Sequence, residues 1–406
     1  MRSDAFSEKQ QEFFLNATHR WNIKTGATRS GKTFMDFFVI PKRIIRTTGS
    51  GLIVLMGNTQ QTLTRNILDP MRKIWGADLV GEISSRTSVV KVFGKKCYAL
   101  GADSADRVAA IQGSSIEYAY GDEVATWAEP VFNMLKSRLD KPNSTFDGTC
   151  NPDNPQHWFK KFLDSDADIY CQRYRIDDNP FLTPEFVANL KQEYAGTVYY
   201  DRYIEGLWTL AEGLIYATFC GDNLYDEAPM EVQARAHHYI TMDYGTANPC
   251  VFLHILYDPY TLDVYVDREY YYDGRAKGAK SDLEYGQDLL EFMPPMPGLQ
   301  VIIDPSALSF RVHMRTLGYR VKEADNDVAD GIRNTSTLIN LRKIKVARRC
   351  RKTIEEFGAY AWNPKAAETG KESPIKQNDH AMDALRYFVN TVVKMKRVAR
   401  NQITGG

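Results

Sequence analysis

Short apolar runs alternate with longer amphipathic stretches through the first half of the chain. The run at 51–58 (GLIVLMGN) has the length of a strand and is followed by a helical pattern that ends near Trp75. Strand-like runs at 116–123 and 145–152 lie on either side of a helical pattern over 127–139. Because strands that alternate with helices form βαβ units, this half predicts a mainly parallel sheet covered by helices.

The N-terminal segment predicts a helix followed by a strand, a glycine-rich turn and a second helix. Residues 7–17 (SEKQQEFFLNA) carry Ser7 at the position of an N-cap and Gln10 three residues later, which is the pattern of a capping box. The next segment, WNIKTGATRSGKTFMDFFVI, contains the turn.

The second half follows a different pattern. Residues 207–235 lose the alternation and are interpreted as a linker. Three strand-like segments then follow in succession (HHYITMDYG, VFLHILYD and LDVYVDREYYYDG), which favours an antiparallel meander. A further strand at 299–306 and a helix at 378–395 complete the pattern. The sequence thus predicts an α/β protein with a first domain at 1–206, a linker at 207–235 and a second, mixed-sheet domain at 236–406.

Composition is typical of a folded soluble chain. Of 406 residues, 43% are hydrophobic and 25% charged, which excludes a disordered tail protein or a small disulfide scaffold. The six cysteines form no C-x-x-C pair, so we expect free thiols in a reducing compartment. The N-terminus has no signal-peptide pattern and no apolar run approaches the length of a membrane span, so we expect an intracellular protein without a membrane partner.

Charge is balanced overall but uneven locally. Lys and Arg total 51, as do Asp and Glu, which argues against a uniformly basic nucleic-acid coat. Residues 341–352 (LRKIKVARRCRK) nevertheless hold seven basic residues and no acidic one, and 386–406 hold five basic residues and no acidic one. Local basic patches of this kind are candidates for contacts with nucleic-acid phosphates.

One motif matches the phosphate-binding loop G-x4-G-K-[ST] at every fixed position. In such a loop the backbone N–H groups surround the β-phosphate of a nucleotide, and the following helix N-terminus favours the anion. Lys32 is predicted to reach the β- and γ-phosphates of ATP, and the Thr33 hydroxyl to ligate Mg²⁺. The matching residues are Gly26, Ala27, Thr28, Arg29, Ser30, Gly31, Lys32 and Thr33.

Two carboxylates close the strand at 116–123. Asp122 is the candidate to hold Mg²⁺, and Glu123 the candidate to polarise the attacking water. By itself this pair is better explained by a surface turn, but the phosphate-binding loop upstream favours the catalytic interpretation.

Three further positions have candidate roles around the nucleotide, each with a structural alternative. Asn151 ends the next strand, where it could sense the γ-phosphate or simply close a turn. Gln10 could recognise the adenine edge or only cap its helix. Arg29 and Arg107 could stabilise transition-state charge or lie on the surface as ordinary arginines.

A second group of acidic residues lies in the second half. Asp243 and Asp304 each end an apolar strand, while Asp379, His380 and Asp383 share one face of the C-terminal helix. Strand-end aspartates together with a helix-borne Asp and His could hold two Mg²⁺ or Mn²⁺ ions for phosphodiester cleavage. The alternative is a set of unrelated caps and turns.

Taken in order, GATRSGKT, YGDE, TCNP, MDYG, IIDPS and NDHAMDALRY resemble the large terminase subunit of tailed bacteriophages and prophages, over about residues 5–395. The resemblance implies a RecA-like P-loop ATPase domain that moves double-stranded DNA, and an RNase H-like nuclease domain that cuts it. It assigns the ATPase roles to Lys32, Thr33, Asp122, Glu123 and Asn151, and the nuclease triad to Asp243, Asp304 and Asp383, with His380 beside it. Gly121 departs from the family pattern, in which an aliphatic residue precedes the acidic pair.

The resemblance also implies partners and a setting. The expected partners are double-stranded DNA, the small terminase subunit and the portal of the procapsid, on which five copies would assemble in the host cytoplasm. Two alternatives differ in kind: a helicase or repair ATPase with an attached nuclease, and an assembly protein that binds nucleotide without turnover. The first would need motifs of a second motor domain, and the sequence contains one P-loop.

Overall fold

The computed structural model describes residues 6–103, 112–245 and 248–393, so that Arg107 and the basic positions after 393 lie outside the described residues. The chain divides into two compact units. The first comprises Met1–Leu190, Val198–Leu210 and Glu368–Lys371, and the second Lys191–Thr197, Ala211–Ala367 and Glu372–Gly406.

The first unit is built on a seven-stranded sheet with the order β3-β4-β2-β5-β6-β1-β7. All neighbouring strands are parallel except β3 and β4, which form an antiparallel hairpin at the edge. The strands are β1 (Trp21–Gly26), β2 (Leu52–Gly57), β3 (Val89–Val92), β4 (Lys95–Gly101), β5 (Ile116–Gly121), β6 (Thr145–Cys150) and β7 (Ile169–Tyr174). Because β5, β6 and β1 are adjacent and parallel, the residues that follow them meet at one edge.

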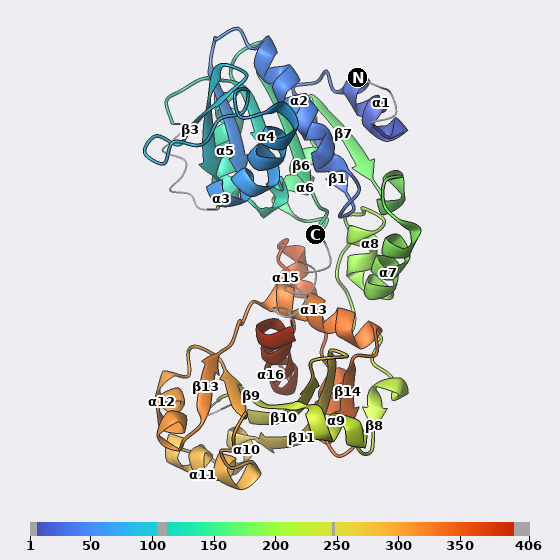
Figure 1. The fold of residues 1–406 in the computed structure, drawn as a ribbon, viewed down its shortest axis with the longest axis vertical. Helices are drawn as coiled ribbons and strands as arrows, with labels where there is room; N and C mark the ends of the chain where they lie inside the picture. The colour runs from blue at the N-terminus through green and yellow to red at the C-terminus, as the bar shows by residue number, and fades with distance from the viewer. Residues whose placement is uncertain (1–5, 104–111, 246–247, 394–406) are drawn as a thin grey trace. The chain divides into compact units, whose positions relative to one another are not determined.

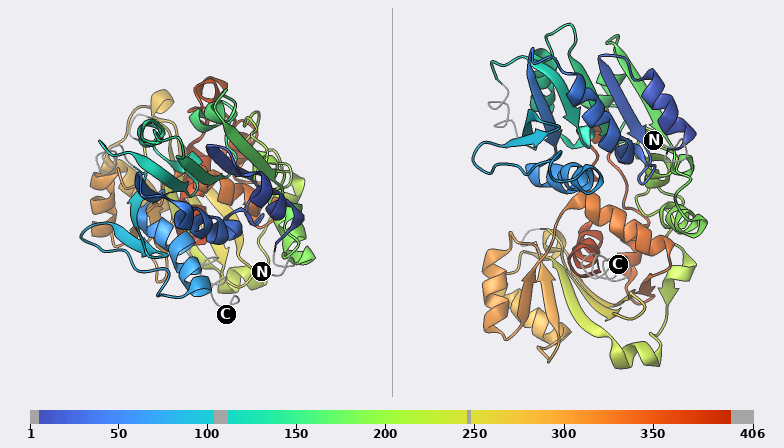
Figure 2. Two further views of the ribbon diagram at one scale, coloured as in Figure 1. Left: turned by 90° about the horizontal axis from the view of Figure 1, so that it is seen from above. Right: turned by 45° about the horizontal axis from the view of Figure 1, so that its top comes forward.

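Helices cover both faces of this sheet (Figures 1 and 2). One apolar cluster joins α2 and the α3–α4 region to one face, and another joins α5 and α6 to the other. The helices of this half of the chain are α1 (Glu8–Asn16), α2 (Lys32–Arg46), α3 (Gln60–Leu63), α4 (Asp69–Trp75), α5 (Glu129–Arg138), α6 (Trp158–Leu163), α7 (Pro184–Tyr194) and α8 (Val198–Tyr203). The predicted capping box of the first helix is confirmed, since Ser7 and Gln10 exchange both hydrogen bonds.

The second unit contains a mixed seven-stranded sheet with the order β13-β12-β9-β10-β11-β14-β8. Its centre is the predicted meander, in which β10 is antiparallel to both β9 and β11. The strands are β8 (Leu224–Tyr225), β9 (His237–Asp243), β10 (Cys250–Asp258), β11 (Asp263–Tyr272), β12 (Gln300–Ile303), β13 (Arg320–Glu323) and β14 (Ile344–Ala347).

Two apolar clusters sandwich this second sheet. On one face α13, α14 and α16 pack against residues such as Leu253 and Val266, and on the other α11 and α12 pack against Ile240 and Phe252. The helices are α9 (Met230–Arg235), α10 (Gly274–Lys277), α11 (Asp282–Phe292), α12 (Leu308–Thr316), α13 (Val328–Asn340), α14 (Arg351–Phe357), α15 (Pro364–Glu368) and α16 (His380–Phe388).

The predicted α/β class, with one mainly parallel and one mixed sheet, is therefore confirmed. The stretch predicted as a linker has structure of its own: from Ala211 onwards it belongs to the second unit and carries β8 and α9. Its apolar positions are too few to reveal two such short elements, because β8 is two residues long. Across the described residues, every helix is too short or too polar to cross a membrane.

Candidate functional site

The glycine-rich loop between β1 and α2 has a backbone that only glycine can follow at its first position. Gly26 has φ 141°, and a Cβ there would lie 2.1 Å from the Tyr174 carbonyl oxygen of β7. Gly31, at the entrance to α2, also has positive φ, at 84°. The loop is therefore pressed against the neighbouring strand and turns directly into a helix N-terminus, as a phosphate-binding loop requires.

Lys32 lies buried within this loop. Its Nζ atom donates to the carbonyl oxygens of Gly26 (2.9 Å) and Ala27 (2.6 Å), and also to Asn151 Oδ1 (3.0 Å). Burial lowers the pKa of Lys32 from its ordinary value, and the charge of Glu123 opposes this effect. The ammonium group thus has loop carbonyls and a side-chain amide as partners, which phosphate oxygens could replace.

Asn151 joins Lys32 to Glu123. While its oxygen accepts from Lys32, its Nδ2 atom donates to Glu123 Oε2 at 3.2 Å. Glu123 itself has left-handed backbone geometry (φ 52°), which is costly for a residue with a side chain and is concentrated at functional sites. Burial raises the pKa of Glu123 above its ordinary value, while the charge of Lys32 lowers it. Three predicted site residues, one at the start of α2 and two after the ends of β5 and β6, therefore form one connected chain.

Asp122 is held by two side chains that the sequence analysis did not identify. Asn66 donates to its Oδ2 atom at 3.1 Å and Thr149 to its Oδ1 atom at 3.2 Å. Burial raises the pKa of this carboxyl group, and these hydrogen bonds oppose the shift. Asn66 lies in a π-helical turn after β2, where no strand-end pattern marks it.

The remaining loop positions differ in their surroundings. Thr33 is half-buried in the first turn of α2, whereas Arg29 is exposed and has positive φ (57°). The backbone carbonyl of Arg29 accepts a hydrogen bond from Asn179 Nδ2 at 2.7 Å. Thus Asn179, from the segment after β7, reaches the loop on the side of Gln10.

Gln10 caps its helix and also contacts the phosphate-binding loop. Its side-chain oxygen accepts from the Ser7 backbone N–H (2.9 Å), and its Nε2 atom donates to the Gly31 carbonyl (2.9 Å). The capping alternative is therefore confirmed, and recognition of adenine stays a prediction that this position beside the loop favours.

A cavity of about 370 Å³ opens beside Gln10 and is lined by Gln10, Gly31, Phe34, Asn179 and Phe181. The side chains of Phe34 and Phe181 are 40% and 60% exposed, respectively. Two exposed rings and two amides beside a phosphate-binding loop suit a purine base.

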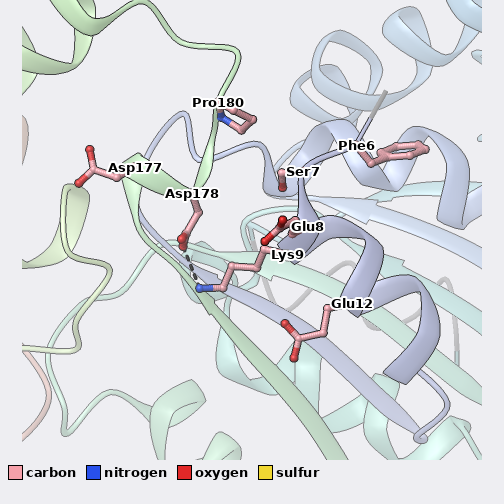
Figure 3. A pocket seen from close by; sticks show the side chains of 8 residues that line it. All are labelled: Phe6, Ser7, Glu8, Lys9, Glu12, Asp177, Asp178 and Pro180. Carbon is pink, nitrogen blue, oxygen red and sulfur yellow. Dashed lines mark hydrogen bonds and ion pairs between the residues drawn. The ribbon is translucent and has the colours of Figure 1, made fainter. Parts of the chain in front are cut away.

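A larger cavity, of about 850 Å³, also borders α1 and differs in charge (Figure 3). Among the described residues that line it, Lys9 is the only basic one, and it forms an ion pair with Asp178 at 2.8 Å. The lining carboxylates are Glu8, Glu12, Asp177 and Asp178. Four carboxylates against one ammonium disfavour a polyphosphate. The smaller cavity is therefore the candidate nucleotide site.

In the second unit, Asp243 and His380 are directly bonded. Asp243 ends β9, on the face that α16 covers, and its Oδ2 atom lies 2.7 Å from His380 Nδ1. Burial raises the pKa of Asp243, and the charges of Asp383 and Asp379 add to the increase. Burial by itself would lower the pKa of His380, but the hydrogen bond and charge of Asp243 hold it above its ordinary value.

Asp383 is held by cations on two sides. Arg386, buried one turn further along α16, donates to its Oδ1 atom at 3.0 Å. Lys376 lies 3.2 Å from its Oδ2 atom and also 3.2 Å from Asp379 Oδ2. A Cβ at Gly331 would lie 2.3 Å from Arg386 Cγ, so the glycine of α13 leaves the space through which this arginine passes. Sequence spacing alone did not identify either cation.

Asp304 lies after β12, beside β9, and accepts hydrogen bonds from the Ser306 backbone N–H (2.8 Å) and from Asn326 Nδ2 (3.0 Å). The pKa of Tyr387 depends on the charge of Asp304 and on the charges of Asp243 and Asp383. Burial raises the pKa of Tyr387, and the charges of Asp243, Asp383 and Asp304 raise it further. The charges of all three predicted carboxylates therefore act on one buried phenol.

The N-terminus of α16 is positioned by a carboxylate outside the predicted set. Glu356 of α14 is 3% exposed and accepts from the backbone N–H groups of Ala381 (2.7 Å) and Met382 (3.3 Å). It also accepts from the Tyr271 hydroxyl at 2.8 Å. Glu356 thus fixes the helix turn that carries Asp379, His380 and Asp383.

One observation argues against a preformed site for a divalent metal, and another argues for such a site. Among the described residues, no three Asp, Glu, His or Cys side chains are placed together as a ready ligand set. The donors are nevertheless the oxygen ligands that Mg²⁺ prefers, and their mutual repulsion adds to the raised pKa of Asp243. Lys376, Arg386 and His380 supply the positive charge around these carboxylates.

Comparison with known proteins shows the family of this chain. The family model for the N-terminal part of the large terminase subunit, T4likevirus type, matches residues 24–220. The large terminase of a thermophilic bacteriophage is 33% identical, with a TM-score of 0.84, over 96% of this chain and 99% of that chain. The chain belongs to the large terminases. No curated protein matches it.

Two further structures of the same thermophilic phage terminase show the same similarity. One is described in complex with ADP (32% identity, TM-score 0.81, 96% of this chain and 100% of that chain). The other is described in complex with ATP-γ-S (33% identity, TM-score 0.81, 96% and 99%). The large-terminase fold thus extends over both units of this chain, and the family resemblance noted from the motifs is confirmed.

Proposed function

We propose that this large terminase hydrolyses ATP in its first unit to drive double-stranded DNA into a procapsid, and cuts concatemeric DNA with its second unit. The observation that carries the ATPase proposal is the chain Lys32–Asn151–Glu123, in which a buried ammonium and a half-buried carboxylate share one amide. We place the motor function before Leu210 and the nuclease function after it.

In the motor, Lys32 would exchange its bonds to the loop carbonyls for the β- and γ-phosphate oxygens of ATP. Glu123 would orient the attacking water and accept its proton, because burial keeps the pKa of this carboxyl above its ordinary value. Mg²⁺, held by Thr33 and Asp122, would neutralise phosphate charge when bound. Arg29 is proposed to stabilise the charge that develops on the γ-phosphate.

Loss of the γ-phosphate would return Lys32 to its present partners. Asn151 is hydrogen-bonded to both Lys32 and Glu123. A movement of Lys32 toward or away from the phosphates would therefore change the hydrogen bonds of Asn151. The ADP and ATP-γ-S complexes of the thermophilic phage terminase support the proposal that this chain binds an adenine nucleotide.

In the nuclease, Asp243, Asp304 and Asp383 are the proposed ligands for Mg²⁺ or Mn²⁺, with Asp379 and His380 beside them. Bound metal would activate a water and stabilise the leaving oxygen of a phosphodiester. Asp243 is bonded to His380, which therefore positions that carboxylate. Arg386 does the same for Asp383.

The proposed partners are the small terminase subunit, the portal of the procapsid and four further copies of the chain, which would act in the host cytoplasm. DNA is the shared substrate of the two units. ATP hydrolysis would move the DNA, and the nuclease would cut it at the start and at the end of packaging.

A pair of variants tests the two activities separately. We expect Lys32→Ala to lower phosphate release from ATP at least about 100-fold and to leave Mn²⁺-dependent DNA cleavage unchanged. Asp243→Ala should do the reverse. Lys42→Ala, a lysine of α2 outside the loop, is the matched control. Turnover by Lys32→Ala at the native rate would contradict the ATPase assignment, and strand separation by the native protein would favour a helicase.

A further inference from the structure

The basic stretch at 341–352, which the sequence indicates as the DNA contact, is largely neutralised by ion pairs. Five of its cations have carboxylate partners within the second unit. At these five positions a phosphate would have to displace a carboxylate, which would then repel it. The pairs are Arg342–Asp222 (3.9 Å), Lys343–Asp263 (3.1 Å), Arg348–Asp226 (3.4 Å), Arg349–Glu227 (2.9 Å) and Lys352–Glu355 (2.6 Å).

A second basic segment, Gly274–Lys280, is different. Arg275 and Lys277 are exposed, and neither has a carboxylate ion-pair partner among the described residues. Arg275 donates instead to the neutral amide of Asn248, and Lys277 lies 5.6 Å from the centre of the Tyr272 ring. Both side chains therefore keep their full positive charge toward solvent.

This segment lies at the same end of the sheet as the nuclease carboxylates. Asp243 pairs with Val251 in the neighbouring strand, and Val251 pairs with Tyr271 in the next, so the three form one row across the sheet. Two strand spacings place Tyr271 about 10 Å from Asp243. The segment begins three residues after Tyr271 and leads through α10 into α11 (Figure 1).

A cavity of about 450 Å³ connects the segment to the helix that carries the nuclease residues. Lys277 lines it, and so does Asn378, which directly precedes Asp379. The carboxylates in its wall are already engaged: Asp273 accepts from the Arg275 backbone N–H (3.0 Å), Glu356 holds α16, and Glu355 pairs with Lys352. Lys277 is the one lysine of this lining without a carboxylate ion-pair partner among the described residues.

We propose that Arg275 and Lys277 bind phosphates of duplex DNA beside the cleavage point at Asp243. This inference rests on the proposed nuclease function. The phosphate backbone of DNA offers closely spaced anions, and Lys and Arg without internal partners are the groups that bind them. The DNA at the nuclease centre therefore passes over Gly274–Lys280 rather than over 341–352.

Salt-dependent DNA binding tests the proposal on the full chain. The affinity for a blunt duplex oligonucleotide is measured at several KCl concentrations with Ca²⁺ in place of Mg²⁺. We expect Arg275→Ala and Lys277→Ala each to weaken binding and to reduce the slope of log affinity against log salt by about 0.9, which corresponds to one phosphate contact.

The matched controls carry the same change of charge. Lys280→Ala removes a lysine of the same segment that is paired with Asp288, and Lys343→Ala removes a paired lysine of the basic stretch. Both should leave the slope unchanged. An unchanged slope in Arg275→Ala and Lys277→Ala, or an equal decrease in Lys343→Ala, would overturn the proposal. Absence of cleavage by the native protein, with the expected slopes, would instead contradict only the nuclease function.

Discussion

Lys32 Nζ lies 3.0 Å from Asn151 Oδ1, so the end of β6 is bonded directly to the phosphate-binding loop after β1. The two strands are neighbours in a parallel sheet, which brings both strand ends to one edge. Through this contact Asn151 can affect ATP hydrolysis, and this effect can be measured separately from nucleotide binding.

We expect Asn151→Ala to lower the rate of ATP hydrolysis about 10- to 100-fold, because Glu123 loses its only side-chain hydrogen-bond donor among the described residues. The affinity for ADP, measured with a fluorescent analogue, should change less than about threefold, since Lys32 retains the loop carbonyls. A native rate of phosphate release in this variant would contradict the role of Asn151.

Phe181 tests the purine site. Its side chain is 60% exposed in the cavity that Gln10 lines. Because stacking of a base on an aromatic ring contributes about 1–3 kcal/mol, we expect Phe181→Ala to raise KM for ATP about 10-fold with little change in kcat. Steady-state kinetics provide the measurement. Phe186→Ala, an exposed phenylalanine of α7 outside the cavity, should leave both constants unchanged.

The proposed metal ligands can be tested by binding as well as by cleavage. We expect Asp383→Asn to weaken Mn²⁺ binding in calorimetry at least about 10-fold, because it removes a charged oxygen ligand. Asp288→Asn, which alters an aspartate paired with Lys280, should bind Mn²⁺ as the native protein does. Chelation by EDTA should stop cleavage of DNA, and restored Mn²⁺ should recover it. Equal Mn²⁺ affinities in the two variants would remove Asp383 from the ligand set.

Glu117 of β5 predicts a pH dependence of stability in the first unit. It is 2% exposed and accepts from the backbone N–H groups of Gly49 (3.0 Å) and Ser50 (3.0 Å) and from Asn143 Nδ2 (2.9 Å). Burial by itself would raise the pKa of Glu117, but hydrogen bonds from Thr48 to Ser50 hold it below its ordinary value. A depressed pKa means that its ionised form stabilises the fold above about pH 4.3 and that this contribution is lost as pH falls.

We therefore expect Glu117→Gln to lower the free energy of unfolding by about 1–3 kcal/mol at pH 7, measured by urea denaturation. The difference from the native protein should shrink when the pH falls below about 4.3. Glu82→Gln, at an exposed position, should be neutral at both pH values. A constant difference across this range would show that ionisation of Glu117 is not its cause.

Much of the fold and the outline of both sites could be predicted from the sequence. Apolar strands that end in Asp or Asn place Asp122, Asn151, Asp243 and Asp304 at sheet edges, and the glycine-lysine motif places Lys32. The side chains that complete each site do not follow from such patterns. Asn66 lies in a helical turn, and Glu356 acts from a different helix, so neither has a fixed spacing to the residue it supports.

The ion pairs of the basic stretch at 341–352 also could not be predicted from the sequence. The composition of 341–352 indicates a positive surface, but its partners Asp222, Asp226 and Asp263 come from segments far earlier in the chain. Ion pairing of this kind depends on the strand order, in which β14 lies between β11 and β8. Local sequence therefore could not predict it.

The division of the chain between the two units has a practical consequence. The chain changes unit at 190/191, 197/198, 210/211, 367/368 and 371/372, and the short segment Glu368–Lys371 belongs to the first unit although it follows almost all of the second. A Cβ at Gly370 would lie 2.9 Å from the Gln156 carbonyl oxygen, so this segment packs closely against the backbone of the first unit. A motor fragment truncated at Leu210 would lack it and leave that surface uncovered. Single-cut truncations are thus poor mimics of either half, and an intact backbone with point substitutions is the better means of separating the two activities.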